Sequence, residues 1–264
     1  MNDTFNLKRF GWLFKKALFE RPMQLFGLLS LTLLISLLLY VILKTILGFE
    51  EGQNASFIFG LVGGGTFLAS FVFNYFSSNA RGSSYLTLPA SHFEKWLCGV
   101  IITGILFTLL FLVFYRIMDS TLVRLYLNGL DPKDPYFQEK FDAVHPFPLN
   151  GFVAGKTYMM FLNFSTAMLI GSLYFNKAAF IKVALIICAL YIGGNFLNYY
   201  MAKAIFGTIE KALPFYCVFI PVGNSFGKVL LPDYASKAVD ICLLYMTPAI
   251  LCIATYIRLR EKEF

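Results

Sequence analysis

Long runs of apolar residues without charges follow one another along most of this chain. A membrane helix needs about 20 mostly apolar residues to cross a hydrocarbon core about 30 Å thick. Runs of that kind predict an all-α polytopic membrane protein, with residues 1–264 forming a single transmembrane domain. The six predicted transmembrane helices are 23–47, 57–76, 96–116, 158–175, 178–201 and 239–257.

The composition agrees with lipid as the solvent of the chain. Hydrophobic residues make up 58% and charged residues only 14%, whereas soluble domains hold roughly 45–50% and about 25%. The 30 Phe and 15 Tyr residues suit lipid contact and the aromatic belts at membrane interfaces. No short apolar core with a small-residue cleavage site opens the sequence, so we expect no removable signal peptide. A soluble enzyme is excluded.

The placement of Lys and Arg predicts the orientation, because cytoplasmic flanks of membrane helices retain these residues. With the N-terminus inside, the whole net charge of +7 falls on the inner segments, and the outer segments hold equal numbers of acids and bases. We therefore expect both termini in the cytoplasm. The fourth span is the least apolar, since Asn163, Ser165, Thr166 and Ser172 interrupt it.

Three segments outside the spans have their own patterns. Residues 7–20 predict an N-terminal interfacial helix on the inner leaflet. Four prolines predict a turn-rich outer loop over 119–156. Residues 202–238 hold a short helical pattern and then a broken apolar stretch too short to span, which predicts an outer re-entrant hairpin before the sixth span. In the interfacial helix, the apolar face holds Leu7, Phe10, Trp12, Leu13, Phe14 and Leu18, and the wet face holds Lys8, Arg9, Lys15 and Lys16.

The inner loop 77–95 carries the most specific pattern. Ser91 and Glu94 stand in capping-box relation before an apolar run, and Pro89 prevents a continuous helix, so the third span should start near Ser91. These capping signals do not account for Ala80–Leu86. It is a second short segment, with one Arg, one Gly and several hydroxyl residues in or beside it.

This layout resembles the membrane subunit of ATP-binding cassette exporters of the type-2 permease superfamily. The resemblance covers nearly the whole chain: the amphipathic start, six spans, the small-polar-Arg segment followed by Leu-Pro-Ala-Ser, and the broken hairpin. The phrase Leu86-Thr87-Leu88-Pro89-Ala90-Ser91 with Glu94-Lys95-Trp96 is similar to bacteroidete members. In such permeases the loop after the second span is a coupling helix that docks on the ATPase.

The resemblance therefore implies a docking helix with defined roles for two side chains. Arg81 would meet a carboxylate of the ATPase and Tyr85 would be an apolar plug. The alternative for Arg81 is that it snorkels or meets anionic lipid. The docking residues would be Ala80, Arg81, Gly82, Ser83, Ser84, Tyr85 and Leu86.

By the same resemblance, this chain is the permease subunit of an exporter in a bacterial inner membrane and not an enzyme. It would pair with a second permease copy or a homologue, contact lipid but no nucleic acid, and bind no cofactor, with ATP and Mg on a separate ATPase. Abundant Phe hints at an amphipathic or lipid-like substrate. Two alternatives remain: a scaffold subunit of a membrane or secretion complex without transport, and a transferase using Asp131, Asp134 and Glu139.

Other motifs point to no chemistry. Gly151-Phe-Val-Ala-Gly155-Lys156-Thr157 has one residue too few for a phosphate-binding loop, and His92 and His145 fall on opposite predicted sides, so they share no metal. The span cores are nearly free of ionisable residues, which speaks against a proton-coupled carrier. Small residues predict tight helix contacts, within the chain or across a dimer, at Gly60, Gly64, Gly193 and Gly194.

Overall fold

A computed structural model describes residues 5–20, 22–77, 79–133, 135–175, 178–214, 217–222 and 225–262. These residues are mostly helical, and five of their helices are long and apolar enough to cross a membrane. The protein is thus a multi-pass membrane protein by length and composition. The five candidate spans are Leu25–Leu47, Phe49–Val72, His92–Asn128, Ala179–Phe206 and Asp233–Arg260.

The first half of the chain is built only from helices. Two of its long helices, 49–72 and 92–128, contain a π-helical segment but run on without a loop. The elements are α1 Leu7–Phe19, α2 Pro22–Leu47, α3 Phe49–Ile58, η1 Phe59–Gly63, α4 Gly64–Val72, η2 Asn74–Ser77, α5 Asn79–Leu86, α6 His92–Val100, η3 Ile101–Leu106 and α7 Phe107–Asn128.

The second half adds a small antiparallel sheet in the order β1-β2-β3. Its hairpin pairs Val222 with Ser225, so only two residues separate β2 from β3. The elements are α8 Phe137–Asp142, α9 Phe152–Tyr174, α10 Ala179–Phe206, β1 Lys211–Leu213, β2 Cys217–Val222, β3 Ser225–Leu230, α11 Asp233–Ile241, η4 Cys242–Met246 and α12 Thr247–Arg260.

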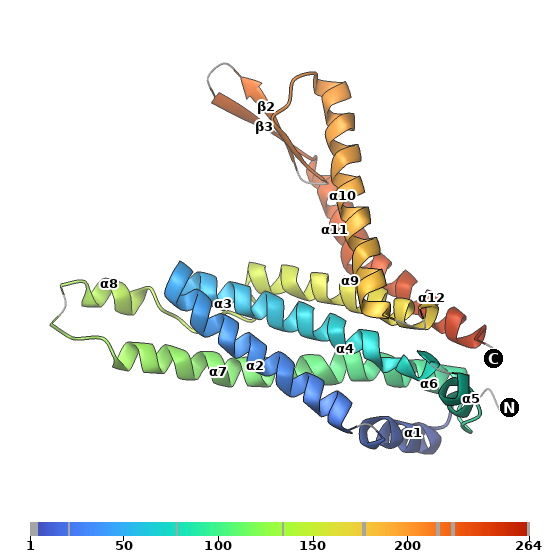
Figure 1. Ribbon diagram of the computed structural model, residues 1–264. Helices are drawn as coiled ribbons and strands as arrows, with labels where there is room; N and C mark the ends of the chain where they lie inside the picture. The colour runs from blue at the N-terminus through green and yellow to red at the C-terminus, as the bar shows by residue number, and fades with distance from the viewer. Residues whose placement is uncertain are drawn as a thin grey trace.

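The helices form a bundle and an arm (Figure 1). α2, α3–α4, α7 and α9 lie side by side, and both chain ends lie at the end of this bundle that carries α1 and α5. α10 and α11 leave the bundle together, and the sheet stands at the far end of α10. The arm is open to its surroundings, since only 6% of the residues in the most apolar 18-residue stretch of Ala179–Phe206 are buried, and only 11% in that of Asp233–Arg260.

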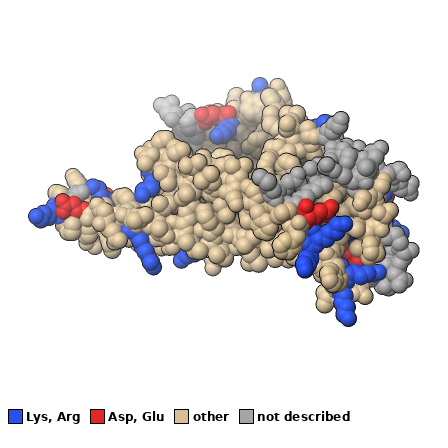
Figure 2. Space-filling model, turned by 60° about the horizontal axis from the view of Figure 1, so that its bottom comes forward, with Lys and Arg blue, Asp and Glu red and all other residues tan. Residues whose placement is uncertain are grey.

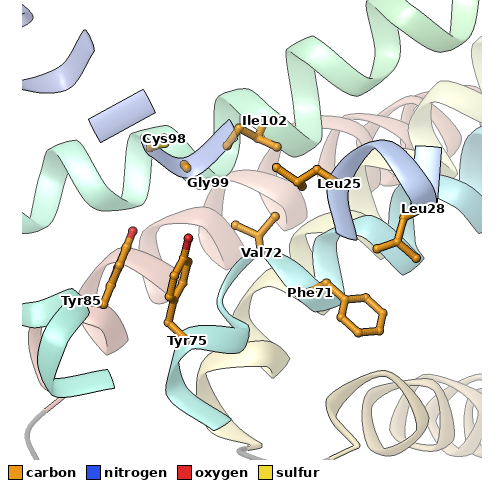
Figure 3. A pocket seen from close by; sticks show the side chains of 10 residues that line it. Leu25, Leu28, Phe71, Val72, Tyr75, Tyr85, Cys98, Gly99 and Ile102 are labelled. Carbon is orange, nitrogen blue, oxygen red and sulfur yellow. The ribbon is translucent and has the colours of Figure 1, made fainter. Parts of the chain in front are cut away.

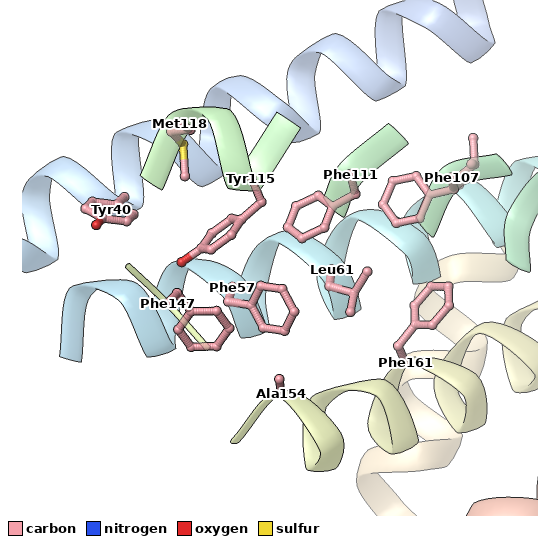
Figure 4. Packing of buried hydrophobic residues seen from close by; sticks show 11 residues of the cluster. Tyr40, Phe57, Leu61, Phe107, Phe111, Tyr115, Met118, Phe147, Ala154 and Phe161 are labelled. Carbon is pink, nitrogen blue, oxygen red and sulfur yellow. The ribbon is translucent and has the colours of Figure 1, made fainter. Parts of the chain in front are cut away.

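An aromatic ladder on α7 fills the core of the bundle (Figure 4). Phe107, Phe111 and Tyr115 recur every four residues on one helix face and stack with ring centroids 6.0 and 5.7 Å apart. Phe57 of α3 packs on Tyr115 at 5.0 Å and on Phe147 of the 143–149 loop at 4.6 Å. Aromatic pairs at these spacings add packing energy to their apolar burial.

Two of the predicted packing glycines allow close helix contacts. A Cβ added to Gly60 would lie 2.7 Å from the Phe111 ring and from Ser36 Oγ, and one added to Gly64 would collide with Thr32. These glycines hold α2 and α7 against the second long helix, which confirms the prediction within one chain. At Gly193 and Gly194 the structure has no heavy atom within 4 Å of such a Cβ. The intrachain form of that prediction is therefore wrong.

The fold class and several boundaries need correction. The chain is not all-α, because β-branched and aromatic residues in 217–222 and 225–230 form strands around a two-residue hairpin. The predicted spans 96–116 and 239–257 lie in longer helices, 92–128 and 233–260, and the predicted span 57–76 overlaps the helix 49–72 but ends in the following turn and η2. The loop 119–156 contains the last turns of α7, α8 and the start of α9. Residues 202–238 are the end of α10, the sheet and the start of α11.

The fourth predicted span, 158–175, is α9, a 23-residue helix that is not among the five candidate spans. Polar side chains lower its hydropathy, and several of them have structural roles. Asn163 Nδ2 donates to the Leu243 carbonyl oxygen at 2.7 Å, and Thr166 Oγ1 donates to its own helix at Leu162 O. Leu243 lies in the π-helical η4, where widened turns release carbonyls from the regular pattern. α9 is thus polar because it contacts other helices along its length.

Candidate functional site

The candidate docking site lies at the bundle end where α1, α5, the start of α6 and the end of α12 meet (Figure 1). The predicted capping box is present. Ser91 is the N-cap of α6, its Oγ accepts from Glu94 N at 3.2 Å, and Glu94 Oε2 accepts from Ser91 N at 2.9 Å. This box ends the turn after α5 and fixes where α6 begins.

Glu94 also fastens α1 to the bundle. Its carboxylate is fully buried and accepts from Asn6 N at 2.7 Å and from the Arg9 guanidinium at 3.1 Å. Charge-assisted hydrogen bonds of this kind are stronger than neutral ones. One carboxylate therefore caps α6 and holds the N-terminal turn of α1.

The apolar face of α1 is covered by protein. Leu13 is buried against Ala90, Cys98 and Ile102, with Phe10, Phe14 and Leu18 packed around them. The prediction that this face lies in lipid is wrong for these residues, because α6 and the turn before it occupy the face. Trp12 and Leu7, by contrast, remain 73% and 74% exposed.

Tyr85 seats α5 on the bundle. Its ring is buried, stacks on Tyr75 with centroids 4.5 Å apart, and meets Phe76 edge-on at 5.8 Å. The Lys95 ammonium lies 5.8 Å from the ring centroid. Burial raises the pKa of the Tyr85 phenol well above its usual value, so the side chain stays neutral. Its predicted role as a plug for a partner is wrong, because the ring is already used inside the chain.

A small cavity of about 40 Å³ lies behind Tyr75 and Tyr85 (Figure 3). The two stacked rings line one side of the cavity, and Cys98, Gly99 and Ile102 lie across from them. A cavity needs roughly 10–15 Å³ for one water molecule, so this space holds only a few waters and no transported molecule.

The part of α5 that faces away from the bundle is polar. Ser83 and Ser84 are exposed and Gly82 is buried. α5 ends where Thr87 folds back, its N–H donating to Ser83 O and its Oγ1 to Ser84 O. The side chains of Ala80, Arg81 and Leu86 lie outside the described part, so the role expected for Arg81 stays a prediction.

No protein-family model, curated protein or solved structure matches this chain. Its function is therefore inferred from the residues and their geometry.

A buried polar network at the opposite bundle end has no counterpart in the sequence-based predictions. Asp119 of α7 is fully buried, and its carboxylate accepts from Tyr40 Oη at 2.7 Å, Gln53 Nε2 at 2.8 Å and Phe147 N at 2.7 Å. Gln53 Nε2 also donates to His145 O at 2.9 Å. The network joins α2, α3 and α7 to the 143–149 loop.

The sequence pattern predicts a span that ends at residue 116 and therefore puts Asp119 at the start of a loop. One signal in the sequence identifies it: Phe107, Phe111, Tyr115 and Asp119 continue one stripe at four-residue spacing. A polar residue at the end of an aromatic stripe is buried with it. The transferase candidates do not join this network; Asp131 and Glu139 are exposed, and Asp134 lies outside the described residues.

Proposed function

We propose that this chain is the permease subunit of an ATP-binding cassette exporter, driven by a separate ATPase that docks on α5. The observation that carries the proposal is α5 itself. It is an eight-residue helix that follows the second candidate span after the short η2, is held on the bundle by a buried tyrosine, and exposes Ser83 and Ser84.

The position of α5 would allow a movement of the docked ATPase to be passed on to the helices of the bundle. Its Tyr85 stacks on Tyr75, which follows α4 directly, and the turn after α5 is closed by the capping box of α6. At the same end, Trp96 Nε1 donates to Cys252 O at 3.1 Å and Lys262 Nζ to Leu173 O at 2.8 Å. A displacement of α5 would therefore act first on η2 and α6, and through the contacts between neighbouring elements on α9 and α12.

The charge distribution supports a membrane position with this end in the cytoplasm. On the face seen in Figure 2, most charged side chains lie towards the left and right ends or along the upper edge, and a broad area between the two ends is tan. Both termini lie at the α5 end, together with the basic helix α1. α9 then counts as a sixth crossing, polar because its neighbours cover it, and the positive α5 end faces the cytoplasm of a bacterial inner membrane.

The buried carboxylate of Asp119 does not favour a proton-coupled carrier. Its three hydrogen-bond donors among the described residues are a phenol, an amide and a backbone N–H, and they fix a loop instead of forming a chain of titratable groups across the bundle. Without a chain of titratable groups to carry protons, transport would need another energy source, and a separate ATPase would provide it. The substrate we propose is amphipathic or lipid-like.

The test is purification of the tagged chain from its native membrane, with ATP turnover measured on what co-purifies. We expect an ATP-binding chain in the wild-type complex. Ser84→Glu adds a negative charge to the exposed face of α5 and should lower the yield of that chain at least fivefold. Gln138→Glu adds the same charge to α8, at the opposite bundle end, and should leave the yield unchanged.

Each result has a defined meaning. If no ATP-binding chain accompanies the wild type and secretion or envelope-assembly components do, the scaffold alternative replaces the exporter. If the ATPase is present but Ser84→Glu and Gln138→Glu behave alike, the ATPase docks elsewhere.

A further inference from the structure

The side of α1 that points away from the bundle combines lysines with aromatic residues. Lys8, Trp12, Lys15, Lys16 and Phe19 are all exposed, and helical spacing places them on the face opposite the buried Leu13 and the half-buried Ala17. Trp12 and Phe19 are 73% and 65% exposed, and the Lys15 ammonium lies 5.9 Å from the Trp12 ring centroid. Exposed aromatic rings among lysines are the composition of a helix at a lipid headgroup layer.

The chain leaves this face little freedom to move away from a membrane. α1 ends at Phe19, α2 begins at Pro22, and the first candidate span begins at Leu25. A few residues reach no further than about 3.5 Å each, so the C-terminal end of α1 stays at the membrane surface.

A groove lies along this helix. It has a volume of about 280 Å³ and is lined on one side by Arg9, Trp12 and Lys16 of α1, and on the other by Leu88 and Pro89 of the turn before α6. Ligand pockets for drug-sized molecules hold about 300–1,000 Å³, so this groove accommodates a headgroup and not a whole lipid. Its polar lining is cationic and its remaining lining is apolar.

The charges of the groove select an anion. Arg9 is paired with buried Glu94, so this pair adds little net charge. Lys16 provides a positive charge at the groove, with Lys8 and Lys15 on the same helix face. Lysines near a membrane surface attract anionic lipid, and a Trp ring beside them suits the glycerol region between headgroup and acyl chain.

We propose that this groove binds the headgroup of an anionic phospholipid from the adjoining leaflet, with the phosphate at Lys16 and the glycerol region against Trp12. Since α1 is fastened to α6 by Glu94 and the turn that lines the groove joins α5 to α6, the bound lipid would brace the candidate docking helix. The site needs a lipid molecule beside α1 but no ATPase, and is therefore tested on the isolated chain.

The experiment is native mass spectrometry of the detergent-purified chain with phosphatidylglycerol or phosphatidylcholine of identical acyl chains. We expect about tenfold preferential retention of phosphatidylglycerol. Lys16→Glu should remove most of this preference, Lys16→Arg should keep it, and Trp12→Ala should lower retention of both lipids. Lys133→Glu, an equal charge change on an exposed lysine far along the chain, is the matched control.

Melting temperatures of the variants separate lost binding from lost folding. Because Lys16 is exposed, we expect Lys16→Glu to melt as the wild type does. Equal retention of the two lipids, or equal effects of Lys16→Glu and Lys133→Glu, would overturn the proposal. So would displacement of phosphatidylglycerol by an equal concentration of glycerol phosphate, because a soluble phosphate ester would then be the ligand. None of these outcomes bears on whether an ATPase docks at α5.

Discussion

At the scale of single residues, two buried carboxylates organise the two ends of the bundle. Glu94 joins α1 to α6 at the candidate docking end, and Asp119 joins three helices to a loop at the other end. Each accepts at least three hydrogen bonds, which compensates the loss of water around a buried acid. Polar residues in an apolar chain thus act here as points of attachment.

Asp119→Ala tests this role. The substitution leaves the Tyr40 hydroxyl and the Phe147 N–H buried without their acceptor, and leaving such donors unpaired costs about 3 kcal/mol in total. We expect a clear fall in the detergent melting temperature. Asp131→Ala, at an exposed turn, should have no measurable effect. Equal melting of the two variants would show that the network adds nothing to stability.

At the scale of elements, glycine is closely packed on one helix and has open space around it on another. Gly64 lies where α2 crosses the second long helix, and an added Cβ would collide with Thr32. Gly193 lies on α10, where an added Cβ would meet no heavy atom within 4 Å. Helix packing therefore depends on Gly64 but not on Gly193.

The glycine pair gives a matched comparison. Gly64→Ala should destabilise the protein by about 1–3 kcal/mol through overpacking. Gly193→Ala should be neutral or stabilise it by up to about 1 kcal/mol, since Ala favours helix over Gly. Thermal melting of both variants in one detergent measures this. A larger loss at Gly193 would mean that α10 packs closely against another molecule.

At the scale of the whole molecule, the bundle buries its own core but the arm does not. Leu190 and Phe196 of α10 are 71% and 60% exposed, and Tyr245 and Ile253 of the last long helix are 65% and 58% exposed. Soluble proteins do not expose such continuous apolar surface. In a bilayer, lipid or a second copy of the chain would cover it.

The proposed orientation is tested by labelling single cysteines in a variant that lacks the five native ones. Ser84→Cys lies on α5 and Asp131→Cys in the loop at the other end, and both positions are exposed. We expect a maleimide that cannot cross the inner membrane to label Asp131→Cys in intact cells and Ser84→Cys only after lysis. The reverse pattern would place the α5 end outside.

The sequence by itself determined the features that depend on composition and local spacing. Long apolar runs gave the helices, because lipid requires internally bonded backbone over about 20 residues, and Ser91 with Glu94 gave the start of α6. The hairpin of β2 and β3 also has a local signal, because only two residues separate two strand-forming segments.

Only the tertiary structure decided which face of an element is covered. Hydropathy cannot tell lipid from protein as the neighbour of an apolar side chain, so the seating of α1 on α6 and the burial of Tyr85 required the packed helices. The same holds for Asp119, whose partners come from residues 28 to 79 positions away in the chain. Contacts between distant segments depend on how helices pack, and no local pattern records them.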